Sequence, residues 1–201
     1  MWQIVNPEFF NKDNLKKLFY YQSIPIYILY VFAALLTYET HHPFHAVISI
    51  SFLTFYSYFI HWIIHKLPYN INIHMLFHHT KMSCPEIGLL IEFAYNILFF
   101  VFFYFLQVLT GLEIVPDIII LFYSVVYVSI HIINYSIFSV RTHTMHHIML
   151  DENVLCNYSP DIFDHYFGTN YDDCYENFSH FIPNIVVAFL VTYYVFTPHT
   201  E

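Results

Sequence analysis

Nine of the fifteen histidines in this chain occur in clusters whose spacing suits metal binding. Residues three or four positions apart share one face of a helix, so each cluster can direct its imidazole nitrogens toward one point. Three helices converging in this way would surround one or two metal ions. A polynuclear metal centre is therefore our first hypothesis, and its candidate ligands are His61, His65, His74, His78, His79, His131, His143, His146 and His147.

The type of ligand narrows the choice of metal without deciding it. Imidazole suits iron, zinc, copper and nickel. A structural zinc site stops at four ligands, so nine clustered histidines indicate two ions. Carboxylate di-iron bundles repeat a Glu-x-x-His pattern, which occurs here once, from Glu39 to His42.

The elements that must position these histidines are membrane helices. Hydrophobic residues make up 58% of the chain and charged residues only 10%, against roughly 25% charged in soluble domains. At about 1.5 Å per residue, some 20 residues cross a hydrocarbon core of roughly 30 Å. A shorter run, Ile182 to Phe196, contains Pro183 and is expected to be an interfacial or half-buried helix. Four runs can span, from about Phe19 to Tyr38, Ala46 to Ile64, Gly88 to Leu109 and Ile118 to Phe138.

We therefore predict one all-α, membrane-embedded domain over residues 1–201. It has about four transmembrane helices and a cytosolic, histidine-rich helical cap around a dimetal centre. By the positive-inside rule, the segments that carry basic residues face the cytosol. These are the N-terminal segment, the connection between the second and third runs and the segment after the fourth run, so both termini and the histidine clusters are predicted to be cytosolic. The six basic residues are Lys12, Lys16, Lys17, Lys66, Lys81 and Arg141.

The histidines form three boxes in chain order: His61-x3-His65, His74-x3-His78-His79 and His143-x2-His146-His147. These boxes resemble those of the fatty acid hydroxylase superfamily of integral membrane oxygenases. Residues 157–164 read Asn-Tyr-Ser-Pro-Asp-Ile-Phe-Asp and are followed by Phe-Gly-Thr at 167–169. This segment resembles the tail after the last box in sterol desaturases, sterol 4-methyl oxidases and sphingolipid hydroxylases. The resemblance covers residues 61–169.

The middle box departs from the commonest family pattern. Hydroxylase members usually have His-x2-His-His, whereas Met75 stands three residues before His78 and the histidine is His74. A residue four before His78 still shares its helical face, so His74 remains a predicted ligand.

Residues outside the boxes are expected to support the site. The resemblance implies that His131 is a lone ligand on the last span; a helix–helix hydrogen bond is its alternative role. Asn134 could hold a metal-bound water or orient a ligand, or bond a neighbouring helix. Metal-bound histidines usually donate their second ring N–H to a carboxylate or carbonyl. The nearest such candidates in sequence are Asn157, Asp161 and Asp164, of which Asp164 could instead cap a turn.

Other polar residues are not predicted to bind metal. His41, His42 and His45 belong to a loop on the far side of the membrane. His165 lies within the tail, but we do not include it in the ligand set. Glu92 would be costly at the bilayer midplane and is expected to reach the interface.

The resemblance implies a membrane-bound, O2-dependent oxidoreductase with two iron ions, in the endoplasmic reticulum. It would act on an unactivated C–H bond of a sterol, a sphingolipid or a fatty acyl chain and give an alcohol or an alkene. Zinc could replace iron on overexpression. The chain has no haem-binding His-Pro-Gly-Gly or dinucleotide fingerprint, so the implied electron donors are an external cytochrome b5 and an NAD(P)H-dependent reductase.

Two alternatives belong to other classes. A membrane b-type cytochrome would ligate haem with histidine pairs on facing spans, rarely as adjacent histidines. A non-catalytic lipid-binding or scaffold relative would retain only a structural metal site, although all nine expected ligand positions are filled. Nucleic-acid binding is not expected because the net charge is −9 and such binding needs a basic face.

Overall fold

The computed structural model describes residues 5–40, 42–79, 85–138, 140–148, 161–171 and 174–196. Within these ranges the regular elements are all helices, which confirms the predicted all-α class. The long helices are α1 (Lys12–Leu36), α2 (Pro43–His65), α4 (Pro85–Thr110), α5 (Asp117–Ser129) and α9 (Ile182–Phe196). The shorter ones are η1 (Pro7–Phe10), η2 (Tyr69–Ile71), α3 (Ile73–Phe77), η3 (Ile130–Asn134), α6 (Tyr135–Ile137), α7 (Arg141–Ile148), α8 (Ile162–Phe167) and η4 (Phe178–Phe181).

Five stretches are long and apolar enough to cross a membrane, one more than the sequence predicted. The additional stretch arises because η4 continues directly into α9 and forms a 19-residue segment, Phe178–Phe196. Pro183 does not interrupt it, since proline is tolerated in the first turn of a helix, where its missing N–H matters least. The other four stretches, which match the predicted spans, are Lys12–Leu36, Pro43–His65, Ile87–Thr110 and Asp117–Ile137.

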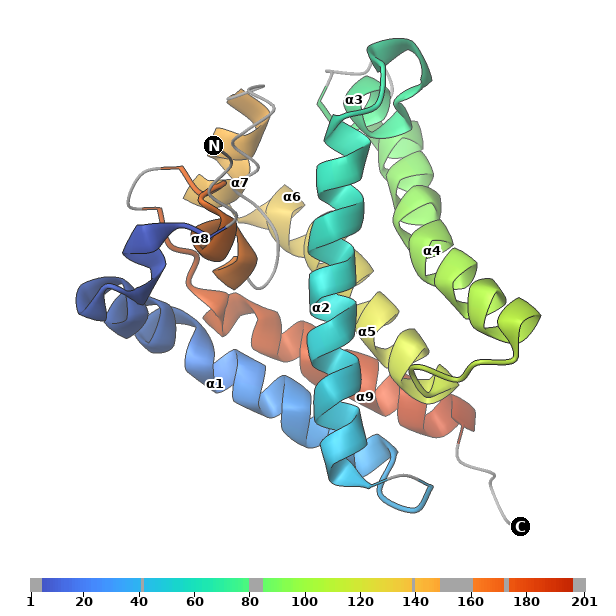
Figure 1. The fold of residues 1–201 in the computed structure, drawn as a ribbon. Coiled ribbons are helices and arrows are strands. Elements are labelled where there is room, and N and C mark those ends of the chain that lie inside the picture. Colours follow the sequence, from blue (N-terminus) through green and yellow to red (C-terminus); the bar gives the residue numbers. More distant parts are fainter. Residues whose placement is uncertain are drawn as a thin grey trace.

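Helix α5 lies at the centre of the bundle and packs against α1, α2, α4 and α9 (Figure 1). Its residues are apolar on almost every face, and both Ile119 and Phe122 are fully buried. A helix that is apolar all round is expected to lie inside a bundle. The position of α5 therefore fixes the position of η3 and α6, which continue it.

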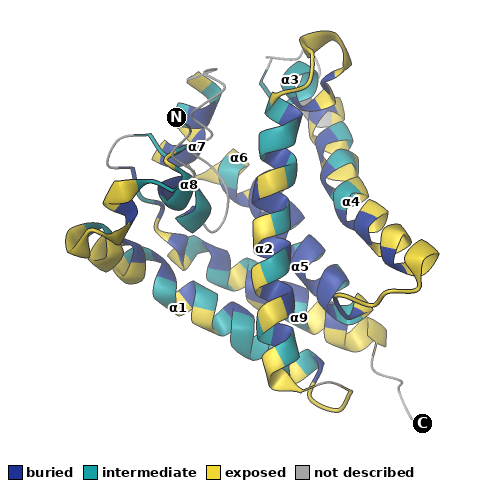
Figure 2. Ribbon diagram, viewed as in Figure 1, coloured by how far each residue is buried: buried dark blue, intermediate teal, exposed yellow. Residues whose placement is uncertain are grey.

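Helix α4 is exposed along much of its length (Figure 2). Leu90, Leu98, Phe102 and Leu109 are each more than half exposed. A contiguous apolar surface of this size on a soluble protein would cause association. Lipid chains are the natural cover for this face, in agreement with an integral membrane protein.

The predicted ligands gather at one end of the bundle, which we call the histidine end and define by His61, His65, His74, His131 and His146. Helix α9 starts there, because Asn134 Nδ2 donates to the carbonyl oxygen of His180 at 2.8 Å. The other end of α9 lies far from it, since Phe196 lines the same cavity as Asp117 at the start of α5. Helix α9 thus runs antiparallel to the segment from α5 to α6.

The course of the five helices predicts that the two ends of the described chain lie on opposite sides of the membrane, whereas four spans had predicted both termini on the cytosolic side. Helix α1 begins at the histidine end, where Gln22 Nε2 donates to Asp161 and Asn14 bonds Tyr175. Helix α9 ends at the opposite end. Single cysteines placed at Gln3 and at Thr200, in a background without the native cysteines, should react with an impermeant maleimide from opposite faces of sealed vesicles. Reaction of both from the same face would show that α9 does not span.

Candidate metal centre

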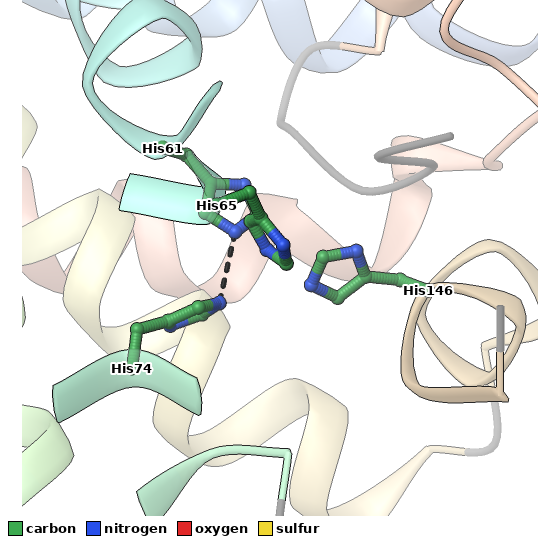
Figure 3. A group of neighbouring side chains, drawn as sticks. All are labelled: His61, His65, His74 and His146. Carbon is green, nitrogen blue, oxygen red and sulfur yellow. Dashed lines mark hydrogen bonds between the residues drawn. The ribbon is translucent and has the colours of Figure 1, made fainter. Parts of the chain in front are cut away.

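All nine predicted histidines lie in one cluster at the histidine end. His61 and His65 stand on the last turn of α2, His74 on α3 and His131 in η3. Overlapping groups of their ligand atoms, each within 4.8 Å of one another, could hold a metal ion. The first group is His61, His65, His74 and His146 (Figure 3). The others are His74, His78, His79 and His146; His78, His143 and His147; and His78, Glu92 and His131.

Asn72 explains how the first two boxes meet. Its side-chain oxygen accepts a hydrogen bond from the Met75 backbone N–H at 3.2 Å and so caps α3. Its Nδ2 donates to the carbonyl oxygen of Ile64 at 2.7 Å, near the end of α2. Asn72 is fully buried, and its short side chain pins the start of the second box to the end of the first.

The distances within the first group suit a shared metal ion. His61 Nε2 and His74 Nε2 are 2.9 Å apart, and His79 Nε2 is 3.2 Å from the same His74 nitrogen. Two nitrogens that each bind one ion at about 2.0–2.1 Å, at roughly right or tetrahedral angles, lie about 2.9–3.4 Å apart. The same separation also permits an N–H···N hydrogen bond. His74 is therefore central to the cluster, which accommodates the longer spacing of the middle box.

The group of His78, His143 and His147 brings α7 against the end of α3. His143 Nε2 and His147 Nε2 are 2.9 Å apart, and both rings lie near that of His78. His78 Nε2 is buried and makes no hydrogen bond. An unsatisfied buried nitrogen costs about 1–3 kcal/mol, and a metal ion at this position would remove that cost. The donor set therefore fits a metal ion here as well.

Glu92, which we did not include among the predicted ligands, stands against two of them. It is buried on α4, with 9% of its surface exposed. Its Oε1 lies 2.6 Å from His131 Nε2 and against His78 Nδ1. A proton on His78 Nδ1 leaves Nε2 as the nitrogen that can bind metal, which is the usual effect of a carboxylate partner. Its position about two turns inside α4, in a run of apolar residues, was the available signal: a carboxylate there needs a partner.

Burial favours the neutral form of His74, His78, His79 and His146. Burial, and then the neighbouring imidazoles, lower the pKa of His74, His78 and His146 well below 6.5. Burial and the nearby His147 lower the pKa of His79 to about 3. Neutral imidazole is the form that binds metal, so these side chains need to lose few protons at pH 7 when an ion binds.

The predicted supporting residues that the structure describes make hydrogen bonds to polar groups around the histidine end. Asn134 bonds His180 at the start of α9, which is the interhelical role considered for it. Asp161 accepts from Gln22 Nε2 and from the Glu176 backbone N–H. Asp164 Oδ1 accepts from Thr169 Oγ1 at 2.8 Å, across the left-handed Gly168 that ends α8. Asn157 lies outside the described residues.

The sequence analysis overlooked Glu176, which joins this network to the metal ligands. The carboxylate is buried and accepts hydrogen bonds from Tyr135 at 3.0 and 3.2 Å and from Thr142 at 3.3 Å. Burial raises the pKa of Glu176 and of Asp161. The Tyr135 ring stacks on His143, with centroids 4.1 Å apart and planes at 16°. Glu176 thereby orients a ring that supports a predicted ligand.

Comparison of this chain with protein-family models, curated proteins and solved structures found no match. The resemblance to the fatty acid hydroxylase superfamily therefore rests on the histidine boxes and the tail, and it remains a prediction.

We expect His78→Ala and His146→Ala to lower the metal content of the purified protein, because each residue belongs to at least two of the four groups. The matched control is His45→Ala, near the start of α2 at the opposite end of the bundle. Elemental analysis of the three variants, each confirmed to be folded by circular dichroism, measures the effect. Equal metal content in all three would contradict the site.

Glu92→Gln should weaken metal binding by about 10- to 100-fold, the range typical for loss of a carboxylate partner of a metal-bound histidine. Glutamine keeps the size of the side chain and removes its charge. Competition with a chromophoric chelator measures the affinity. Asn96→Ala, one turn further along α4, is the control, since its side chain bonds the Glu92 carbonyl within the same helix. Unchanged affinity in Glu92→Gln would mean that the carboxylate only fills space.

Proposed function

We propose that this protein is a membrane-bound, di-iron, O2-dependent hydroxylase or desaturase that acts on an unactivated C–H bond of a lipid. The observation that carries the proposal is the convergence of nine histidines from three boxes and a lone η3 position at one end of a membrane-type helix bundle. A structural zinc ion would need only four of them. The two ends of the cluster, one around His61 and His65 and the other around His143 and His147, provide nitrogens for two ions.

Two iron ions at this site would supply O2 activation and hydrogen abstraction. Hydroxylation consumes O2, two electrons and two protons and yields the alcohol and water; desaturation yields the alkene and two waters. The protein residues keep the site dry: His61, His74 and His146 are almost fully buried. The Glu92 carboxylate sets which nitrogen of His78 faces the cluster, and Tyr135, held by Glu176, supports His143.

The charge distribution supports a cytosolic location for the site. The described basic residues of the chain lie toward the histidine end: Lys12, Lys16 and Lys17 near the start of α1, Lys66 at the end of α2 and Arg141 at the start of α7. Positive charge of this kind marks the cytosolic side. We propose that the protein resides in the endoplasmic reticulum membrane, where a cytochrome b5 and its NAD(P)H-dependent reductase supply electrons from that side.

The proposal predicts two bound iron ions per active chain and a strict requirement for every component of the electron supply. In reconstituted membranes with several lipid classes, product should form only when cytochrome b5, reductase, NAD(P)H and O2 are all present. Mass spectrometry would detect the gain of one oxygen atom or the loss of two hydrogen atoms. His146→Ala should give no product, and His45→Ala should retain activity.

Two results would contradict this proposal. One is product formation without O2. The other is the absence of product from every lipid despite two bound iron ions and a competent donor, which would favour a non-catalytic lipid-binding protein.

A further inference from the structure

A large apolar cavity lies between α4 and α5, within the membrane-spanning part of the bundle. Its volume is about 640 Å³. Phe100, Ile120 and Val128 form a buried floor, each no more than 4% exposed. Phe93, Ile133 and Phe196 form a rim that is about half exposed. A buried floor with an exposed rim describes a pocket that opens sideways toward the lipid.

The shape of this cavity suits an elongated guest. Its lining on α5 and η3 runs from Asp117 to Ile133, which is about 24 Å at 1.5 Å per residue. The lining is almost wholly apolar over that length, which suits a hydrocarbon chain.

A second, narrow cavity lies directly beneath the metal centre. His61 and His74 line it, together with Tyr56, Asn96 and Tyr127. Its volume is about 10 Å³, close to the least space that holds one water molecule. This is the membrane-side approach to two of the predicted ligands, and it is too small for a substrate as it stands.

Phe100 separates the two cavities, since it lines both of them. Its ring is 2% exposed and packs against Tyr56, Tyr123 and Tyr127, with centroids 6.3, 5.7 and 5.4 Å away. Because Phe100 is the residue common to the two linings, displacement of its ring would join the large cavity to the space below His61 and His74.

We propose that Phe100 is a gate between a chain-binding cavity and the metal centre, and that the guest is a single unbranched hydrocarbon chain of a membrane lipid. This inference rests on the proposed function and narrows its substrate class. A single hydrocarbon chain is slimmer than a fused sterol ring system, so an opening made by one side chain favours the chain. Phe100 is thus a specificity-determining residue and not a catalytic one.

Photo-crosslinking of the metal-loaded protein in lipid nanodiscs tests the gate without turnover. The probes are a straight-chain fatty acid with a diazirine at its methyl end and a sterol with a diazirine on its rings. In the wild-type protein, the chain probe should label the α4–α5 cavity, for example at Ile97 and Val125. In Phe100→Ala the label should shift toward α2, at Tyr56 and Ile60.

Two further variants keep the result interpretable. Phe103→Ala removes a buried ring nearby on α4 that packs against Phe52 and Tyr56, so it carries a similar loss of packing. It should retain the wild-type labelling pattern. Phe100→Leu removes the ring with less disturbance and should reproduce the shift if Phe100→Ala fails to fold.

Each outcome bears on the gate separately from the oxygenase proposal. Absence of chain label from the cavity, the same shift in Phe103→Ala, or sterol label beneath His61 in the wild-type protein would overturn it. The expected shift with no oxidised product from any lipid would support the gate and count against the oxygenase. Product formation without cavity label would support the oxygenase and count against the gate.

Discussion

The structure depends on holding nine imidazoles together at one end of the bundle, with His61, His74, His131, His143 and His146 buried. Their nitrogens approach to 2.9–3.2 Å, as in the His61–His74 and His143–His147 pairs. Burial of polar nitrogens is unfavourable unless each finds a partner, and simultaneous protonation of neighbours is excluded by repulsion. Such a cluster persists only where a rigid scaffold supports it and a ligand, here expected to be metal, satisfies the nitrogens.

In the scaffold, apolar side chains pack the helices together, and hydrogen bonds from a few polar side chains hold the connecting segments. The central α5 positions η3, and its regular α-helix changes to a π-helical turn where His131 faces α4. Local π-helical turns often occur at functional sites because they redirect a side chain. At the far end, Gln107 accepts from the backbone N–H groups of Ile114 and Val115 and donates to the Val115 carbonyl. That side chain satisfies loop backbone where membrane surroundings would not.

A group of polar residues from the tail and from the segment before α9 holds α7 and η3 in position. Asp161 and Glu176 lie at its centre, and neither is expected to touch a metal ion directly. Burial raises the pKa of both carboxyls, and both accept hydrogen bonds from neighbouring groups. In the described part of the tail, Asp161 accepts from the Glu176 backbone N–H, and Glu176 in turn accepts from Tyr135 and Thr142.

The sequence alone was sufficient for the all-α class, four spans and a common location for the nine histidines, since hydrophobic run length and the spacing of residues on a helix are local properties. It could not place Glu92 against His78 and His131, because that contact joins residues from three segments and depends on how α4 packs on η3. It also missed the fifth candidate span, since the 3₁₀ turn at Phe178–Phe181 has no apolar periodicity of its own and joins α9 only in the folded chain. The role of Phe100 was equally invisible: a phenylalanine in an apolar run becomes a partition only when tertiary packing puts a cavity on each side of it.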